Sequence, residues 1–151
     1  MSGDPLSADV LKSLWGHAET GYPEEICGFL VEGSSGIAVR PAENRQNALH
    51  AEDPEHFPRD ARTAYNLGPK DLFYLDRHLS GDERVTAIYH SHCDVGAYFS
   101  DEDQRAALFD GEPLYTVDYV VIDVRADGAR QAKRFRWDGQ TFAEVASYER
   151  R

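Results

Sequence analysis

The chain has 151 residues, the size of one ordinary domain, and we expect a single domain over residues 1–151. Hydrophobic residues (41%) and charged residues (28%) occur at the levels of a folded domain, which excludes disorder as its main state. No apolar run reaches the ~18 residues of a membrane helix. The 27 acidic against 16 basic residues give a net charge of −11, which disfavours binding to nucleic acid or to an anionic membrane surface.

The N-terminal part of the chain predicts a helix followed by a β-hairpin. Its first six residues lack the basic and apolar regions of a signal peptide, so we expect a cytoplasmic protein. Ser7 is a candidate N-cap for a helix whose apolar residues recur on one face and which ends at Gly21. Residues 26–31 are an apolar run typical of a buried strand, and residues 37–40 predict its partner across a turn.

The middle of the chain is less regular. From residue 41 to residue 69, prolines and polar residues predict loops, with a short strand near His56 and Phe57 and a helical turn over residues 60–65. The apolar spacing that follows predicts a helix over residues 70–79.

The C-terminal half predicts four strands and one helix. A strand over residues 85–89 leads into the sequence His-Ser-His, and Ser100 is a candidate N-cap for a helix over residues 101–109, whose first turn is acidic. Further strands, the last two joined by an Asp-Gly turn, are predicted at residues 115–124, 131–137 and 140–145. Strands interleaved with helices predict an α/β fold with a mixed sheet and helices packed on it.

A candidate metal site lies at the end of the strand that contains the two histidines. His90 and His92 are two residues apart, so both side chains project from one face of the strand, and Asp103 on the next helix can add a carboxylate. Two imidazole nitrogens and one carboxylate oxygen leave a fourth position open for water, as in a catalytic zinc site. A His-x-His pair alone often arises by chance, whereas Ser100 and Asp103 at fixed offsets beyond it make chance a weaker explanation.

Hydrolysis at such a site also needs a group that takes a proton from water and returns it to the leaving amine. A carboxylate near the metal is the usual solution, and Glu24 and Glu25, just before the first buried strand, are the candidates. Spacing alone places neither of them beside His90. A solvated acidic turn is the alternative, and for Glu24 we prefer it.

These residues together resemble a known family signature. The signature of the JAMM (MPN-plus) metalloprotease family is an upstream Glu, then His-[Ser/Thr]-His, seven residues, Ser, two residues and Asp. The chain matches this order with Glu25, His90-Ser91-His92, Ser100 and Asp103. The opening Pro-Glu-Glu-Ile-Cys-Gly, which starts at Pro23, is similar to the bacterial single-domain branch. The resemblance covers nearly the whole chain and implies the MPN fold, a curved mixed sheet flanked by helices and similar to that of cytidine deaminase.

The resemblance also implies a role for each matching residue. His90, His92 and Asp103 match the ligands of one zinc ion per chain, and Glu25 matches the residue that acts as general base and then as general acid. Ser100 matches the serine that stabilises the oxyanion, a role that is compatible with its expected N-cap.

The chain departs from the bacterial branch at Cys93, a position where Pro is very common. A ligand, a redox-active thiol and a packing residue are the alternatives, and we prefer packing because the ligand set is already complete. Cys27 is interpreted as a small buried residue, and we expect both cysteines to be free thiols. Ser91 is expected to face away from the metal, because alternate strand residues do. The aromatic residues Tyr98 and Phe99 can either hold a peptide tail or pack inward.

The implied function is a zinc-dependent peptidase or isopeptidase. Such an enzyme hydrolyses the amide bond after the C-terminal tail of a ubiquitin-like protein, and the bacterial kind is similar to enzymes that process small sulfur-carrier proteins of the ThiS/MoaD type. A carrier of this kind, ending in Gly-Gly, is therefore the expected substrate and partner, with its tail bound as an extended strand. The identity of the carrier, the bond type (peptide, isopeptide or amino-acid adduct) and the oligomeric state stay open.

Two other function classes are considered. A non-catalytic MPN-type scaffold or protein-interaction domain is the main alternative, but such relatives have usually lost the ligand residues that this chain retains. A nucleobase deaminase would require His-x-Glu and Pro-Cys-x-x-Cys, and the sequence contains no Cys-x-x-Cys. Metal content separates the scaffold from both hydrolases.

Overall fold

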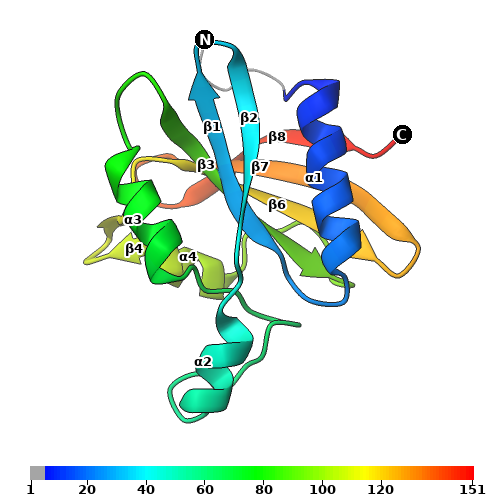
Figure 1. Cartoon of the computed structure of the whole chain (residues 1–151), viewed down its shortest axis with the longest axis vertical. Helices are drawn as coiled ribbons and strands as arrows, with labels where there is room; N and C mark the ends of the chain where they lie inside the picture. The colour runs from blue at the N-terminus through cyan, green and yellow to red at the C-terminus, as the bar shows by residue number, and fades with distance from the viewer. Residues whose placement is uncertain (1–5) are drawn as a thin grey trace.

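A computed structural model describes residues 6–151 and contains a six-stranded mixed sheet with the order β2-β1-β3-β6-β7-β8 (Figure 1). Its strands are β1 (Cys27–Gly33), β2 (Gly36–Ala42), β3 (Arg84–Cys93), β6 (Asp118–Arg125), β7 (Gly128–Trp137) and β8 (Phe142–Glu149). A separate small hairpin consists of β4 (Leu108–Phe109) and β5 (Glu112–Pro113). The helices are α1 (Ala8–Gly21), α2 (Gln46–Glu52), α3 (Pro69–Arg77) and α4 (Asp101–Ala107).

The sheet is mixed because one neighbouring pair of its strands is parallel. β3 and β6 run in the same direction, whereas the other neighbouring pairs are antiparallel. Both parallel strands are buried along most of their length, as expected for strands covered on both faces. The α/β prediction with a mixed sheet and packed helices is therefore confirmed.

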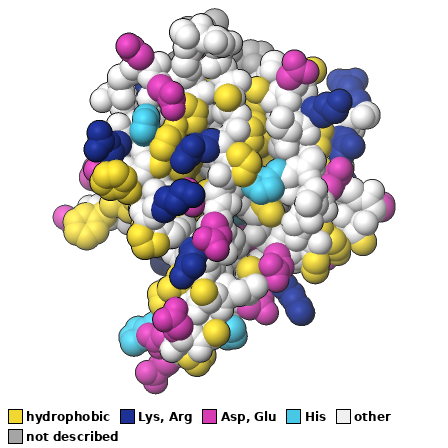
Figure 2. Space-filling model, in the orientation of Figure 1, with side chains coloured by type: hydrophobic (Ala, Val, Ile, Leu, Met, Phe, Trp, Pro, Cys, Tyr) yellow, Lys and Arg dark blue, Asp and Glu magenta, His cyan; other side chains and the backbone are white. Residues whose placement is uncertain are grey.

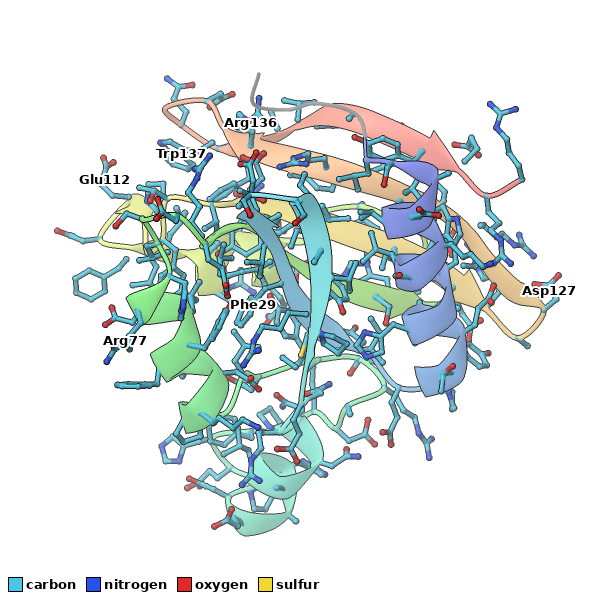
Figure 3. The ribbon with its side chains drawn as sticks, turned by 45° about the horizontal axis from the view of Figure 1, so that its top comes forward. Phe29, Arg77, Glu112, Asp127, Arg136 and Trp137 are labelled. Carbon is cyan, nitrogen blue, oxygen red and sulfur yellow. The ribbon has the colours of Figure 1, made fainter. Side chains whose placement is uncertain are left out.

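Each face of the sheet has its own hydrophobic core. Adjacent strand residues alternate between the two cores, as the strand period requires: Leu30 packs in the core that includes α1, and Phe29 packs in the core that includes Leu75 of α3. Phe29 lies between β1 and α3, where it stacks on Tyr74 (Figure 3). Figure 3 also shows Asp127 at the turn between β6 and β7.

Gly28 allows the strands that carry the site to approach closely. A Cβ atom at this position would lie 2.4 Å from the hydroxyl oxygen of Tyr89 and 2.6 Å from the carbonyl oxygen of Arg40, so no larger residue fits. The Tyr89 hydroxyl is also 2.7 Å from Nδ1 of His17, which connects α1 to the central strand. The Cys-Gly pair of the sequence signature therefore has a packing reason in this chain.

The main differences from the predicted elements lie in the middle of the chain. α2 is a helix where loops were predicted, and the predicted strand near His56 and Phe57 is wrong, because residues 54–56 form a turn. Residues 61–63 form a turn rather than a helical segment, and α4 ends at Ala107 because the β4–β5 hairpin begins at the next residue. α2 has no apolar stripe, and its one buried residue is the polar Gln46. Hydrophobic periodicity therefore gave no signal for this helix.

α2 and the chain that follows it form a projection from the body of the domain (Figure 1). Figure 2 shows that acidic and histidine side chains gather on this projection. Within residues 6–151, no helix is long and apolar enough to cross a membrane.

Candidate metal centre

The two candidate histidine ligands are buried at the centre of the sheet. His90 has no exposed surface and His92 is 4% exposed. The backbone of His90 is paired with Cys27 of β1 on one side and with Val121 of β6 on the other. Strands on both sides therefore fix the backbone from which the two imidazoles project.

Asp103 reaches the histidines from the first turn of α4. A capping box holds it there: the backbone N–H of Asp103 donates to Oγ of Ser100, and the backbone N–H of Ser100 donates to Oδ2 of Asp103, both at 3.0 Å. Oδ1 of Asp103 lies 3.3 Å from Nε2 of His90, and Oδ2 lies 3.2 Å from Nε2 of His92. The structure therefore brings the three predicted ligands together, with one ligand atom from each within 4.8 Å of the others.

The arrangement fits a small divalent metal ion. Nδ1 of His92 donates to the carbonyl oxygen of Gly96 at 3.0 Å, which leaves the lone pair on Nε2 facing the cluster. Both ring nitrogens of His90 are buried and have no hydrogen-bond partner among the described residues. A tetrahedral ion with bonds of about 2.0–2.1 Å would hold its ligand atoms about 3.3 Å apart, close to the observed His–Asp separations.

The protonation states also suit a metal site. Burial lowers the pKa of His90, although the nearby Asp103 carboxylate opposes this shift, so the ring is neutral and can donate a lone pair. Burial raises the pKa of Asp103, but the neighbouring His90 and His92 rings outweigh this effect and lower it below its usual value. A neutral imidazole and an ionised carboxylate are the forms that bind metals.

Aromatic residues form part of the wall around the histidines. The Tyr65 ring stacks on His90 with the ring centroids 4.5 Å apart, and Tyr98 meets His92 edge-on at 4.9 Å. Tyr98 is 50% exposed, so it remains available to a bound peptide. Phe99 instead packs inward against Tyr119 and Phe135, which decides between the two interpretations of these neighbouring aromatic residues.

Glu25 lies just before β1, and its backbone is held from two sides. Its N–H donates to the carbonyl oxygen of Ala61 at 2.7 Å, and its carbonyl oxygen accepts from Nδ2 of Asn44 at 2.8 Å. Burial and the Asp103 charge raise the pKa of Glu25 to about 9, and the Arg59 charge opposes this rise. Glu25 is outside the ligand cluster, but it is close enough to Asp103 for the two charges to interact.

Ser91 and the cysteines have structural positions. Oγ of Ser91 accepts from the backbone N–H of Ile26 at 2.9 Å, so Ser91 joins the start of β1 to β3. Cys27 is buried, Cys93 is partly buried, and both thiols are free. Glu24 is exposed and accepts a hydrogen bond from Asn47 at 3.0 Å, as a solvated turn residue does.

The raised pKa of Glu25 predicts a pH-dependent stability of the metal-free protein. Between the ordinary pKa of 4.5 and about 9, the folded state retains a proton that the unfolded state has lost, so stability falls as the pH rises through this range. Glu25→Gln removes the ionisable group, so the stability of the variant should not fall with pH in this way. At pH 8 we expect the metal-free variant to be more stable than the metal-free wild type by roughly 1–3 kcal/mol. Urea unfolding of both proteins at pH 5 and pH 8 measures the difference, and equal pH dependence would contradict a protonated Glu25.

The fold and the His-His-Asp cluster together define an α/β domain with a JAMM-type site that could hold a metal, as in a metallohydrolase. The model of the prokaryotic homologues of the JAB domain matches residues 7–138, and the chain belongs to that family.

Solved structures show the same fold. The solution structure of protein DSY2949 from Desulfitobacterium hafniense is 18% identical, with a TM-score of 0.56, and the match covers 92% of this chain and 87% of that one. The solution structure of a protein from Salinibacter ruber is 22% identical, with a TM-score of 0.58, and covers 93% and 87% respectively. Among curated proteins, none matches this chain.

The sequence did not identify two further residues of this region. Tyr65 and Arg59 lie in the irregular segment between α2 and α3, where the sequence carries no periodic signal. The stacking of Tyr65 on His90 and the effect of the Arg59 charge on Glu25 result from how this segment folds back onto the sheet. The hydrogen bonds from Asn44 to the carbonyl oxygens of Glu25 and Ala64 are part of that folding.

Proposed function

We propose that this chain is a zinc-dependent peptidase or isopeptidase that hydrolyses the amide bond after the C-terminal tail of a ubiquitin-like sulfur-carrier protein of the ThiS/MoaD type. The observation that carries the proposal is the convergence of His90, His92 and Asp103, with the His90 nitrogens buried and unpartnered among the described residues. Membership of the JAB family supports metallohydrolase chemistry at this cluster.

Zinc held by these three residues would supply a Lewis acid and lower the pKa of a coordinated water, while one coordination position remains open. Without metal, the raised pKa keeps Glu25 protonated at neutral pH, and the positive charge of a bound zinc would lower this pKa toward the ionised form that a general base needs. In the proposed reaction, Glu25 takes a proton from the attacking water, whose oxygen bonds to the acyl carbon. The C–N bond then breaks, and Glu25 returns the proton to the leaving amine.

Ser100 is proposed to stabilise the negative charge on the acyl oxygen. Its Oγ accepts the cap hydrogen bond from Asp103, so the hydroxyl proton remains available as a donor, and it has no acceptor among the described residues. Capping and oxyanion stabilisation therefore use different parts of the same hydroxyl.

The proposed role of Ser100 leads to a mutational prediction. Ser100→Ala removes both functions of the hydroxyl, so we expect turnover to fall about 10²-fold and stability to fall by about 1 kcal/mol. Ser100→Thr retains a hydroxyl and a cap, and should retain most of the turnover. Initial rates and urea unfolding of the two variants separate catalysis from capping, and unchanged turnover in Ser100→Ala would leave Ser100 as a helix cap alone.

The proposed substrate is a small carrier protein whose tail ends in Gly-Gly. An extended diglycine tail has no side chains, and the edge-on Tyr98 beside His92 offers it an exposed wall. The net charge of −11 favours a carrier with a basic contact face.

The test of the proposal is hydrolysis of a defined carrier. A ThiS/MoaD-type protein with one alanine added after its Gly-Gly is incubated with zinc-loaded protein, and loss of the alanine is followed by intact-mass spectrometry. The expected result is removal of the alanine, with no removal by the chelator-treated protein and recovery after zinc is added back. Bound zinc without hydrolysis of this carrier would refute the proposed substrate, and failure to bind zinc would refute the peptidase.

A further inference from the structure

Arg59 lies on the segment that follows α2 and contacts the candidate base. Its carbonyl oxygen accepts a 2.8 Å hydrogen bond from Nε2 of Gln46, a polar side chain that is only 4% exposed. Two residues later, Ala61 accepts the backbone hydrogen bond from Glu25. The backbone of Arg59 is thus fixed close to the point where this segment contacts Glu25.

The guanidinium of Arg59 points toward α4, and most of its N–H donors have no partner among the described residues. Nη1 donates to the carbonyl oxygen of Thr63 at 3.2 Å, which is its one hydrogen bond to the part of the chain described. Nη2 lies 3.9 Å from Oε1 of Glu102, the residue before Asp103, which is too far for a hydrogen bond. A guanidinium has five N–H donors, so most of them are free at this half-exposed position.

Glu102 compensates the Arg59 charge only in part, because it has a closer partner. Arg105, on the same helix, donates to the same oxygen of Glu102 at 2.5 Å. Arg59 is also the basic residue whose charge opposes the rise in the pKa of Glu25. A positive charge therefore lies beside the first turn of α4, on the segment whose Ala61 contacts the Glu25 backbone, in a chain whose net charge is −11.

The chemistry of the proposed reaction indicates what this cation meets. Glu25 gives its proton to the leaving nitrogen, so the leaving group is expected on the Glu25 side of the site, where the segment that contains Arg59 contacts Glu25. If the leaving group is an amino acid with a free C-terminus, its carboxylate carbon is about 2.5 Å from that nitrogen, two bonds away. The leaving ε-nitrogen of a lysine isopeptide bond is instead attached to an apolar chain. Arginine binds a carboxylate with two parallel hydrogen bonds, and a methylene chain offers it none.

We propose that Arg59 is a specificity-determining residue that binds the α-carboxylate of the leaving amino acid. The site then removes a single C-terminal residue or amino-acid adduct from the carrier tail in preference to releasing a lysine of another protein. This inference rests on the proposed hydrolase function and decides its bond type.

Two forms of one carrier protein test the inference. A ThiS/MoaD-type carrier is prepared with the tail Gly-Gly-Ala, ending in a free carboxylate in one form and in a carboxamide in the other. We expect wild-type kcat/KM to be about tenfold or more higher for the acid, with the difference mainly in KM and decreasing as salt is added. A third form, linked through its Gly-Gly to the ε-nitrogen of a lysine peptide, should be cleaved no faster than the carboxamide.

Variants assign the preference to one side chain. Arg59→Gln should cleave the acid and the carboxamide with equal kcat/KM, and Arg59→Lys should retain part of the preference. Because each variant is compared with itself on two substrates, any effect of Arg59 on Glu25 cancels. Arg62→Gln is the matched control, since Arg62 is an exposed arginine on the same segment, and it should retain the full preference.

The outcomes separate the inference from the proposed function. Equal wild-type cleavage of acid and carboxamide, or a preference that survives in Arg59→Gln, would overturn the inference and leave the hydrolase intact. If no form is cleaved, the proposed function fails, and affinities of the acid and carboxamide carriers for zinc-loaded Glu25→Gln protein decide the inference. If Glu25→Gln protein binds the acid carrier more tightly than the carboxamide, and the double variant Glu25→Gln/Arg59→Gln does not, the carboxylate site is supported. Equal affinities of Glu25→Gln protein for the two carriers overturn it.

Discussion

Glu25→Gln is expected to abolish turnover and leave metal binding intact. The substitution preserves the shape of the side chain but removes its ability to accept and return a proton, and general base catalysis contributes about 10²–10⁴-fold to such reactions. Glu25 is outside the His-His-Asp cluster, so the metal content should equal that of the wild type. Release of alanine from the extended carrier and metal analysis on the same preparation measure both quantities.

Glu24→Gln is the control for this substitution. Glu24 is the neighbouring carboxylate, but it is exposed and bonded to Asn47, and glutamine can still accept that hydrogen bond. We expect this variant to retain wild-type turnover. Near-normal turnover or loss of metal in Glu25→Gln would contradict the role of Glu25 as the base.

His92→Ala is expected to lose both metal and activity. The substitution removes one of three ligands and leaves a cavity beside Asp103, whereas the wild type should hold about one zinc ion per chain. Metal that binds only the folded state stabilises it, by about 2.7 kcal/mol at a free concentration one hundred times the Kd. Zinc addition should therefore raise the melting temperature of the wild type and leave that of His92→Ala unchanged.

His56→Ala provides the matched comparison. His56 is largely exposed on the projection that contains α2, where it pairs with Asp53, and it does not belong to the cluster. This variant should bind zinc as the wild type does. A wild-type protein that takes up no zinc even when it is added would mean that the three ligands do not act together, and the scaffold would become the better hypothesis.

The sequence predicted the parts of the structure in which local pattern and tertiary environment agree. β3, which contains His90-Ser91-His92, is buried along most of its length, and α4 begins after its N-cap Ser100 because its capping residues are local. Side-chain alternation in the strand and the first turn of the helix were sufficient to expect that the three candidate ligands converge. A local pattern cannot place Glu25 beside them, and the resemblance to a family supplied that expectation.

The segment between β2 and α3 was predicted poorly for a physical reason. Its structure depends on hydrogen bonds between residues far apart in sequence, such as those from Gln46 to Arg59 and from Asn66 to Gln46. Polar contacts of this kind leave no periodic trace, so α2 was missed and a strand was predicted where a turn occurs. Tyr65 and Arg59 were missed together with it.

The same segment makes one side of the candidate site less stable than the other. Between residues 43 and 68 the buried residues are Gln46, Ala61 and Gly68, and only the partly buried Tyr65 and Leu67 pack this unit against the core of the α3 face. Units of this kind open locally at a lower free energy than the sheet does. Opening would detach Ala61 from the Glu25 backbone while the three ligands stay on β3 and α4. Mild denaturant should therefore abolish the proposed activity while the sheet and any bound metal persist, so that activity is lost under milder conditions than those that unfold the domain.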